Sequence, residues 1–173
     1  MSKIALLSTG DEVVEGEILN TNSQSLAEII TEQGYEIGRH IVCRDLETEI
    51  KTCIDSLLAE HQCVIVTGGL GPTADDRTRF AVAKLINQPL VFHAPTWRWL
   101  EERYMKLNIA IPETNRQQAM FPKNSEILFN ENGSADGCFL EYDNKIIIML
   151  PGPPNECIPI LKNLVIPKLK KFL

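Results

Sequence analysis

The first half of the chain repeats one pattern three times: a short apolar run is followed by the residue spacing of an amphipathic helix. The apolar runs predict strands over residues 3–8, 35–43 and 63–67. Helices are predicted from about Asn22 to a stop at Gly34, from a cap at Asp45 or Thr48 through Leu58, and over residues 76–87. Because the runs are apolar rather than alternating, this order favours a parallel sheet that helices cover on both faces.

The second half of the chain is less regular and adds an antiparallel element. Two segments, residues 138–142 and 145–150, flank Asp143-Asn144, which is typical of a two-residue hairpin turn. The other predicted elements are a helix over 95–108, a short polar helix over 113–120, a strand over 125–129 and a last helix that starts at 151–154. The core-facing positions of the 95–108 helix are expected to be Trp97, Leu100, Tyr104 and Leu107.

Length and composition restrict the class of protein. With 173 residues, 44% of them hydrophobic, the chain can bury one sizeable core. The formal net charge of −6 and the lack of a Lys/Arg stripe argue against a nucleic-acid partner. No apolar run reaches transmembrane length, and residues 1–3 lead directly into a strand, so we expect no membrane partner and a cytoplasmic location. The spacing of the cysteines and histidines predicts reduced structural thiols and no structural zinc.

A glycine-rich bend follows the third predicted strand. The strand ends at Gly68, Gly69 and Gly71, and the acidic pair Asp75-Asp76 precedes the next predicted helix. Glycines adopt positive φ readily and let an anion approach backbone N–H groups, so a bend of this kind before a helix is typical of a phosphate site. The loop lacks both the P-loop pattern and the dinucleotide glycine spacing. Taken alone, it is equally consistent with a tight turn that binds no ligand.

Three further segments with loop-forming residues follow apolar runs: Thr9–Glu12, Cys43–Asp45 and Pro151–Pro154. Since the carboxyl ends of parallel strands share one edge, we expect these segments and the glycine-rich bend to form one binding crevice. Asp45 can instead be only a helix N-cap, and Asn20–Asn22 only a helix start. Arg116 is interpreted either as reaching a bound anion or as pairing with Glu113.

Several sequence blocks occur in the order seen in a known family: Ser8–Glu12, Gly16–Asn22, Thr67–Thr78, Asn115–Ala119 and Leu150–Glu156. On these blocks the chain resembles the MoaB/Mog-like molybdopterin-binding domains and, among them, the N-terminal domain of the competence/damage-inducible CinA proteins. The resemblance covers nearly the whole chain. A set of blocks in register is far more specific than any single loop.

The resemblance implies an α/β fold, a three-layer α/β/α sandwich whose mostly parallel sheet carries an antiparallel hairpin and a loop-lined pocket at its edge. In the wider family the matching glycine loop and its acid hold the phosphate and pterin of molybdopterin or its adenylate. In CinA-type domains the implied activity is metal-dependent hydrolysis of ADP-ribose or a related dinucleotide diphosphate, and related domains of FAD synthases bear on flavin nucleotides. The alternative is a non-catalytic protein that binds molybdopterin or a nucleotide and is linked to molybdenum-cofactor biosynthesis.

Full CinA proteins continue into a nicotinamide-nucleotide deamidase domain, whereas this sequence ends at Leu173. We therefore expect a single domain over residues 1–173 without the deamidase. Self-association, which is frequent in the family, would use the segment over residues 95–121.

The resemblance and the loop pattern together give the candidate site. The expected catalytic residues are Asp76, Asp45 and Glu12, and Asp76 and Asp45 are also the expected ligands of a divalent Mg, Mn or Co ion. The residues expected to bind the phosphate-bearing ligand are Thr9, Gly10, Asp11, Asn22, Thr67, Gly68, Gly69, Gly71, Pro72, Thr73, Thr78, Arg116, Pro151, Gly152 and Pro153.

Overall fold

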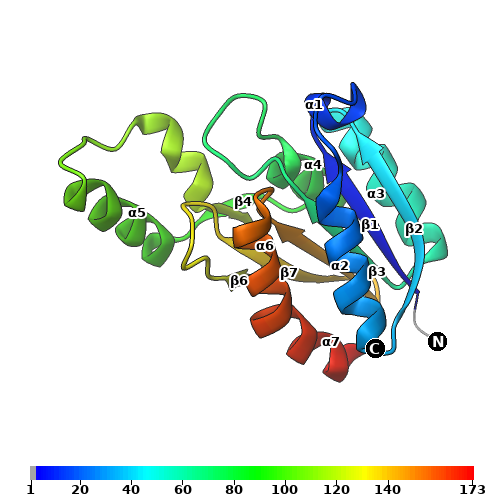
Figure 1. The fold of residues 1–173 in the computed structure, drawn as a ribbon. Helices are drawn as coiled ribbons and strands as arrows, with labels where there is room; N and C mark the ends of the chain where they lie inside the picture. The colour runs from blue at the N-terminus through cyan, green and yellow to red at the C-terminus, as the bar shows by residue number, and fades with distance from the viewer. Residues whose placement is uncertain (1–2) are drawn as a thin grey trace.

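A six-stranded sheet with the strand order β2-β1-β3-β8-β7-β6 forms the centre of the protein in a computed structural model that describes residues 3–173 (Figure 1). The first two residues of the predicted 1–173 domain lie outside the described residues. The strands of this sheet are β1 (Lys3–Thr9), β2 (Glu36–Cys43), β3 (Cys63–Thr67), β6 (Glu126–Leu128), β7 (Gly137–Tyr142) and β8 (Lys145–Leu150). Strands β2, β1, β3 and β8 are parallel, and β7 runs antiparallel to both β8 and β6. The predicted mostly parallel sheet with an antiparallel hairpin is confirmed.

Helices alternate with the strands along the chain. Their bounds are α1 (Asp11–Val14), α2 (Thr21–Glu32), α3 (Glu47–Glu60), α4 (Thr78–Leu85), α5 (Ala94–Lys106), α6 (Pro154–Ile160) and α7 (Ile166–Phe172). A 3-10 helix, η1 (Glu113–Ala119), follows α5, and a π-helical turn, η2 (Leu161–Val165), joins α6 to α7. A separate antiparallel ribbon, β4 (Leu90–Phe92) with β5 (Met120–Pro122), brackets α5 and η1, so that α5 stands apart from the main sheet (Figure 1).

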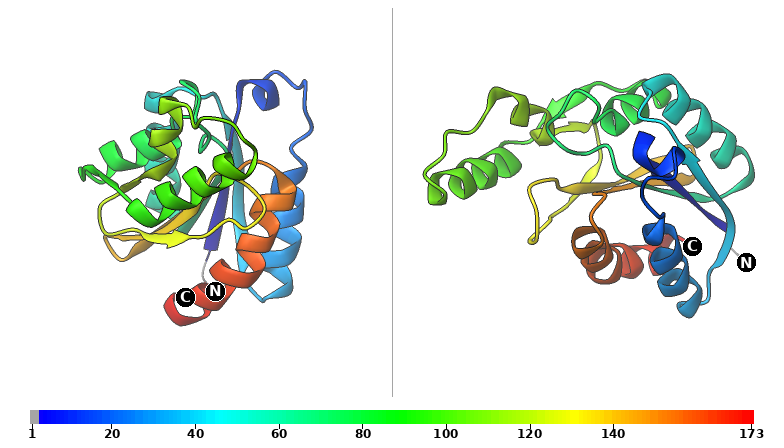
Figure 2. Two further views of the ribbon diagram at one scale, coloured as in Figure 1. Left: turned by 90° about the vertical axis from the view of Figure 1, so that its left-hand side faces the viewer. Right: turned by 45° about the horizontal axis from the view of Figure 1, so that its top comes forward.

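The sheet lies between two layers of helices (Figure 2), and each layer closes its own hydrophobic core. In β1, Ala5 and Leu7 face the core under α3 and α4, whereas Ile4 and Leu6 face the core under α2, α6 and α7. All four side chains are at most 1% exposed. Strands buried on both faces explain why the sequence shows apolar runs instead of alternation.

Three local predictions are wrong. Helix α4 begins at Thr78, two residues after the predicted start, and the N-cap of α3 is Leu46, so neither Asp45 nor Thr48 caps it. Leu107, predicted to face the core, is 61% exposed because α5 ends at Lys106. The predicted hairpin turn is confirmed: Asp143 and Asn144 take φ values of 49° and 60°.

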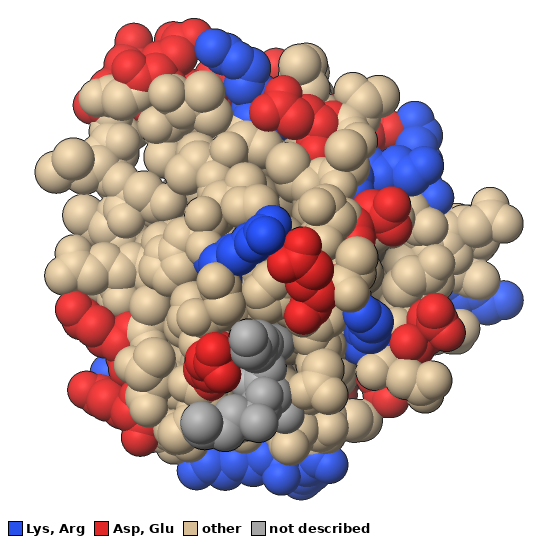
Figure 3. Space-filling view, turned by 90° about the vertical axis from the view of Figure 1, so that its right-hand side faces the viewer, with Lys and Arg blue, Asp and Glu red and all other residues tan. Residues whose placement is uncertain are grey.

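The surface mixes charges of both signs. Figure 3 shows the face beyond β2, where acidic and basic side chains are scattered among residues of other kinds. Arg39 and Glu60 form one such pair, with 3.1 Å between Nη2 and Oε2. Among the described residues, no helix is both long enough and apolar enough to cross a membrane.

Candidate functional site

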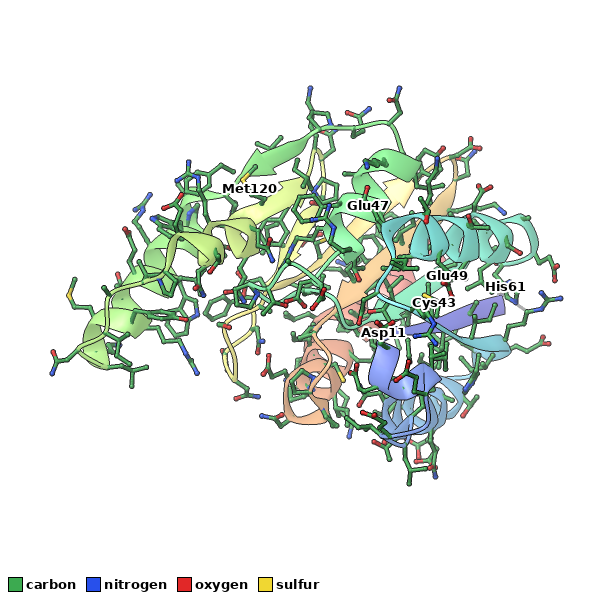
Figure 4. The ribbon with its side chains drawn as sticks, turned by 90° about the horizontal axis from the view of Figure 1, so that it is seen from above. Asp11, Cys43, Glu47, Glu49, His61 and Met120 are labelled. Atoms are coloured by element: carbon green, nitrogen blue, oxygen red, sulfur yellow. The ribbon has the colours of Figure 1, made fainter. Side chains whose placement is uncertain are left out.

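A cleft of about 470 Å³ opens at the carboxyl-terminal edge of the parallel strands. The described residues that line it are Thr9, Glu12, Asp45, Gly68, Gly69, Leu70, Gly71, Thr73, Asp75, Asp76, Gln118, Ser134, Ala135, Pro151, Gly152, Pro153 and Glu156. Figure 4 looks onto this edge and shows the labelled Asp11, at the start of α1, near Cys43 at the end of β2. The loops after β1, β2, β3 and β8 thus meet in one cleft, as the sequence predicts.

Hydrogen bonds fasten these loops to one another. The N–H of Gly68 donates to Leu150 O at 3.1 Å, and the N–H of Gly10 donates to Cys43 O at 3.1 Å. The side-chain amide of Asn22 donates to Gly152 O. The first two bonds each join the ends of two neighbouring strands, and the third joins the start of α2 to the loop after β8, so the cleft is formed by several segments rather than by any single loop.

Two glycines of the bend after β3 take conformations that other residues rarely adopt. Gly68 and Gly69 have φ values of +96° and +68°. A Cβ at position 68 would lie 2.8 Å from Thr9 O, and one at position 69 would overlap Thr78 Oγ1. The glycines are therefore required both by backbone geometry and by close contact.

Thr78 turns the carbonyl groups of this bend away from the cleft. Its Oγ1 donates to Gly68 O at 2.8 Å, and its N–H donates to Gly69 O at 3.2 Å. In a trans peptide the N–H points opposite to the C=O, so the N–H groups of Gly69 and Leu70 point the other way. No hydrogen bond between described residues uses these two N–H groups. Such a row of free donors is a binding site for an anion.

Asp76 closes a turn instead of starting helix α4. Its Oδ2 accepts from the N–H of Thr73 at 2.9 Å and from Thr73 Oγ1 at 2.7 Å. This local pair explains the late start of α4, because the segment before Thr78 is committed to the turn. No hydrogen bond between described residues involves Asp76 Oδ1, which leaves that oxygen for a ligand.

Asp45 is a half-buried acid that also lines the cleft. Burial is the main cause that raises the pKa of its carboxyl group, and the negative charge of Glu12 raises it further. The hydrogen bond that Asp45 Oδ2 accepts from the N–H of Asp11, at 3.2 Å, opposes the shift. Asp45 therefore lines the cleft and binds the loop after β1 instead of capping α3.

A divalent ion can be held by a cluster of protein side chains, or by one or two carboxylates together with waters and a ligand's phosphate oxygens. Among the described residues, no group of three or more His, Cys, Asp or Glu side chains is arranged to hold a metal. Mg²⁺ in proteins commonly binds one or two carboxylates, several waters and the phosphate oxygens of a substrate. Asp76 and Asp45 fit the arrangement with one or two carboxylates, in which waters and the ligand supply the other oxygens.

Seven predicted ligand residues do not line the cleft: Gly10, Asp11, Asn22, Thr67, Pro72, Thr78 and Arg116. Asp11, Asn22 and Thr78 support it through the hydrogen bonds described above. Arg116 does not join the group. Its guanidinium lies 4.6 Å from the centre of the Phe92 ring, and no ion pair between described residues joins it to Glu113.

Some residues of the cleft were not among the predicted ones. Gln118 is fully buried and donates through Nε2 to Ser134 Oγ at 3.1 Å, and Glu156 Oε2 accepts from Asn130 Nδ2 at 2.6 Å. Both lie in blocks that carry the family resemblance, which was the signal available for them. Ser134 and Ala135 lie in an irregular loop between β6 and β7, where the sequence offers no periodicity to place them.

A family model described as "Probable molybdopterin binding domain" matches residues 5–171. The chain belongs to this family. Among curated relatives of this molybdopterin-binding domain is a "Putative competence-damage inducible protein" from Clostridium botulinum, 43% identical over 98% of this chain. A protein of the same description from Clostridium acetobutylicum is 38% identical over 98% of the chain. The chain spans 42% and 41% of the length of these two relatives.

Solved structures give the same assignment for the fold. The CinA protein of Thermoplasma acidophilum superposes with a TM-score of 0.89 at 28% identity, covering 99% of this chain and 98% of that one. The molybdopterin biosynthesis enzyme MoaB of Thermus thermophilus shares the fold, with a TM-score of 0.64 at 16% identity over 99% of this chain and 96% of that one. The predicted three-layer MoaB/Mog-like fold and the CinA-type resemblance are confirmed.

Proposed function

We propose that this molybdopterin-binding domain is a nucleotide pyrophosphatase that hydrolyses ADP-ribose or a related dinucleotide diphosphate with a divalent metal. One observation carries the proposal: free N–H donors on Gly69 and Leu70 share a cleft with several carboxylates. Donors suit the negative oxygens of a diphosphate, and carboxylates suit a metal ion bound to those oxygens. Similarity to CinA-type proteins favours this reading over other anion sites.

In this proposal each residue has a defined part. The N–H groups of Gly69 and Leu70 bind the diphosphate and stabilise charge that develops on it. Asp76 and Asp45 would hold the metal, and the charge of Glu12 acts on Asp45 from nearby. When bound, Mg²⁺, Mn²⁺ or Co²⁺ would polarise the diphosphate and lower the pKa of a water.

The test is a hydrolysis assay. Purified protein with ADP-ribose and each of the three metals should release AMP and ribose 5-phosphate. Asp76→Ala should lower kcat at least about 100-fold, since the oxygen facing the ligand is lost. Glu113→Gln, an exposed change in η1, is the matched control and should leave turnover intact. No turnover of any nucleotide diphosphate with any of these metals excludes the enzyme.

A second candidate is a non-catalytic protein that binds molybdopterin or a nucleotide in molybdenum-cofactor biosynthesis. The description of the matching family favours it. A thermal-shift panel with ADP-ribose, FAD, NAD, AMP and molybdopterin, each with and without metal, separates the two candidates. Stabilisation by molybdopterin alone supports the second candidate, and metal-dependent stabilisation by ADP-ribose supports the first.

We also propose that self-association uses the segment over residues 95–121, which contains most of α5. Met105, Leu107 and Ile109 are 73%, 61% and 57% exposed near the end of this helix, more apolar surface than an isolated helix end requires. Sedimentation velocity should show a dimer or higher oligomer that Leu107→Asp converts to monomer. A wild-type monomer at tens of micromolar contradicts this proposal.

A further inference from the structure

The cleft proposed for a diphosphate has no basic side chain on its surface. None of the described residues that line it is Lys or Arg. Its charged groups are the carboxylates of Glu12, Asp45, Asp75, Asp76 and Glu156. These carboxylates repel an anion unless positive charge lies close behind the wall of the cleft. A cation does lie in the protein interior next to the glycine bend: Arg79, on α4, is only 3% exposed.

Arg79 is buried with hydrogen bonds to carbonyl groups and no ion pair, and the charge of the buried Asp136 carboxylate acts on it from nearby. Its Nη1 donates to Leu70 O at 2.7 Å and its Nη2 to Asp136 O at 3.0 Å, and its guanidinium lies 5.1 Å from the centre of the Phe121 ring. No ion pair between described residues includes Arg79, and its buried Nε has no hydrogen-bond partner. Burial lowers the pKa of Arg79 to about 10, which leaves it charged at neutral pH. Taking a guanidinium out of water costs free energy, which its hydrogen bonds and the nearby Asp136 charge offset only in part.

The contact with Leu70 sets the direction of one peptide group. Since the peptides of the described residues are trans, the Gly71 N–H points opposite to the Leu70 carbonyl. That carbonyl points at the buried Arg79, so the Gly71 N–H points toward the cleft, which Gly71 lines. Thr78 orients the N–H groups of Gly69 and Leu70 in the same sense. Gly71 therefore completes a row of three donors.

We propose that Arg79 is the positioning residue of this anion cradle: it fixes the third N–H donor and supplies, from behind the loop, the positive charge that the cleft lining lacks. The inference rests on the proposed function, because it assumes that the cleft accepts a diphosphate. The carboxylate of Asp76 lies on the cleft side of the same loop and is close enough for its charge to act on Arg79.

Arg79→Lys is the first test, because it keeps the charge but lacks the fork that reaches two carbonyls. With Mg²⁺ and pyrophosphate as the probe, calorimetry should give a Kd about 10- to 100-fold above that of the wild type. In ¹H–¹⁵N spectra of the free protein, the Gly71 amide should shift and exchange faster. Thr96→Val is the matched control. It removes the hydroxyl that donates to Asp136 Oδ2 at 2.7 Å in the same buried network, and both readouts should stay unchanged.

Arg79→Ala separates the effect of the charge from that of packing. Millimolar guanidinium should restore pyrophosphate binding to this variant. Urea, which has the same shape but no charge, and NaCl at equal ionic strength should not. If Arg79→Lys does not fold, Arg79→Ala is purified with guanidinium instead. Pyrophosphate binding and the Gly71 amide are then measured before and after the guanidinium is removed.

Two results overturn the inference. One is an Arg79→Lys variant that binds pyrophosphate as tightly as the wild type with an unchanged Gly71 amide. The other is a Thr96→Val variant with an equal loss, which would show that any damage to the buried network weakens binding. Wild-type protein that binds neither pyrophosphate nor ADP-ribose overturns the proposed function instead, and the Gly71 amide still decides whether Arg79 orients the loop.

Discussion

At the scale of single residues, the burial of Asp45 in the cleft has a consequence for stability. Its pKa is raised in the folded protein, chiefly by burial, so folding is favoured when it is protonated and the advantage is lost as the pH rises through the folded pKa. At neutral pH the ionised carboxylate therefore destabilises the fold. Asp45→Asn should raise the melting temperature at pH 7 by about 1–3 °C, and the gain should disappear below the pKa of an unfolded Asp, about 3.9. Scanning calorimetry at both pH values checks this, and an equal gain at both contradicts it.

Gly69 permits a comparison in which backbone strain is held constant. Gly69→Ala places a side chain at φ +68° and against Thr78 Oγ1, whereas Gly16→Ala places one at φ +77° with nothing within 4 Å. Both changes should destabilise by about 1–2 kcal/mol from strain alone. Only Gly69→Ala should also abolish pyrophosphate binding, because it displaces the N–H donors. Denaturant unfolding and calorimetry measure the two effects, and equal anion affinity in the two variants would refute the assigned role of the bend.

At the scale of elements, the β7–β8 hairpin is the clearest case of local sequence setting structure. Its two turn residues both have positive φ, which suits a type I′ turn and favours glycine at the second position. Asn144→Gly should raise the free energy of unfolding by about 0.5–1 kcal/mol, and Asn144→Val should lower it by more. Urea titration measures both, with similar slopes expected for the three proteins. A destabilising Asn144→Gly would contradict this turn geometry.

The elements also show which features the sequence predicts well. Strand identity, the hairpin and the meeting of loops at one edge follow from local patterns plus the geometry of a parallel sheet. The start of α3 does not, because Asp45 bonds the Asp11 N–H, a partner 34 positions away, instead of capping the nearby helix. The position of Arg116 against Phe92 is likewise non-local. Gln118 and Glu156 enter the cleft through tertiary packing of segments that have no common periodicity.

At the scale of the whole molecule, the cleft lies at the edge of the central sheet, and helix α5 does not line it. Most of the walls of the cleft follow β1, β2, β3 and β8, which are paired in that sheet, and Gln118 of η1 with Ser134 and Ala135 of the β6–β7 loop complete them. Helix α5 itself contributes none of the described lining residues and stands apart on the separate β4–β5 ribbon (Figures 1 and 2). A ligand that binds only the folded protein stabilises it by RT ln(1 + [L]/Kd), about 2.7 kcal/mol at a hundredfold excess over Kd. The contacts that provide this free energy would be made by the loops at the strand ends.

Hydrogen exchange should therefore give an uneven response to pyrophosphate with Mg²⁺. Amides of residues 9–12, 68–76 and 150–156 should gain protection first, because their local opening breaks contacts with the bound anion. Amides of α5 should keep their rates, because that helix can open while the cleft stays intact. Sodium chloride at equal ionic strength controls for screening of the surface charges. Protection that appears instead in residues 94–111 would place the anion on α5 and the loop after it. That result would contradict a binding site at the edge of the central sheet.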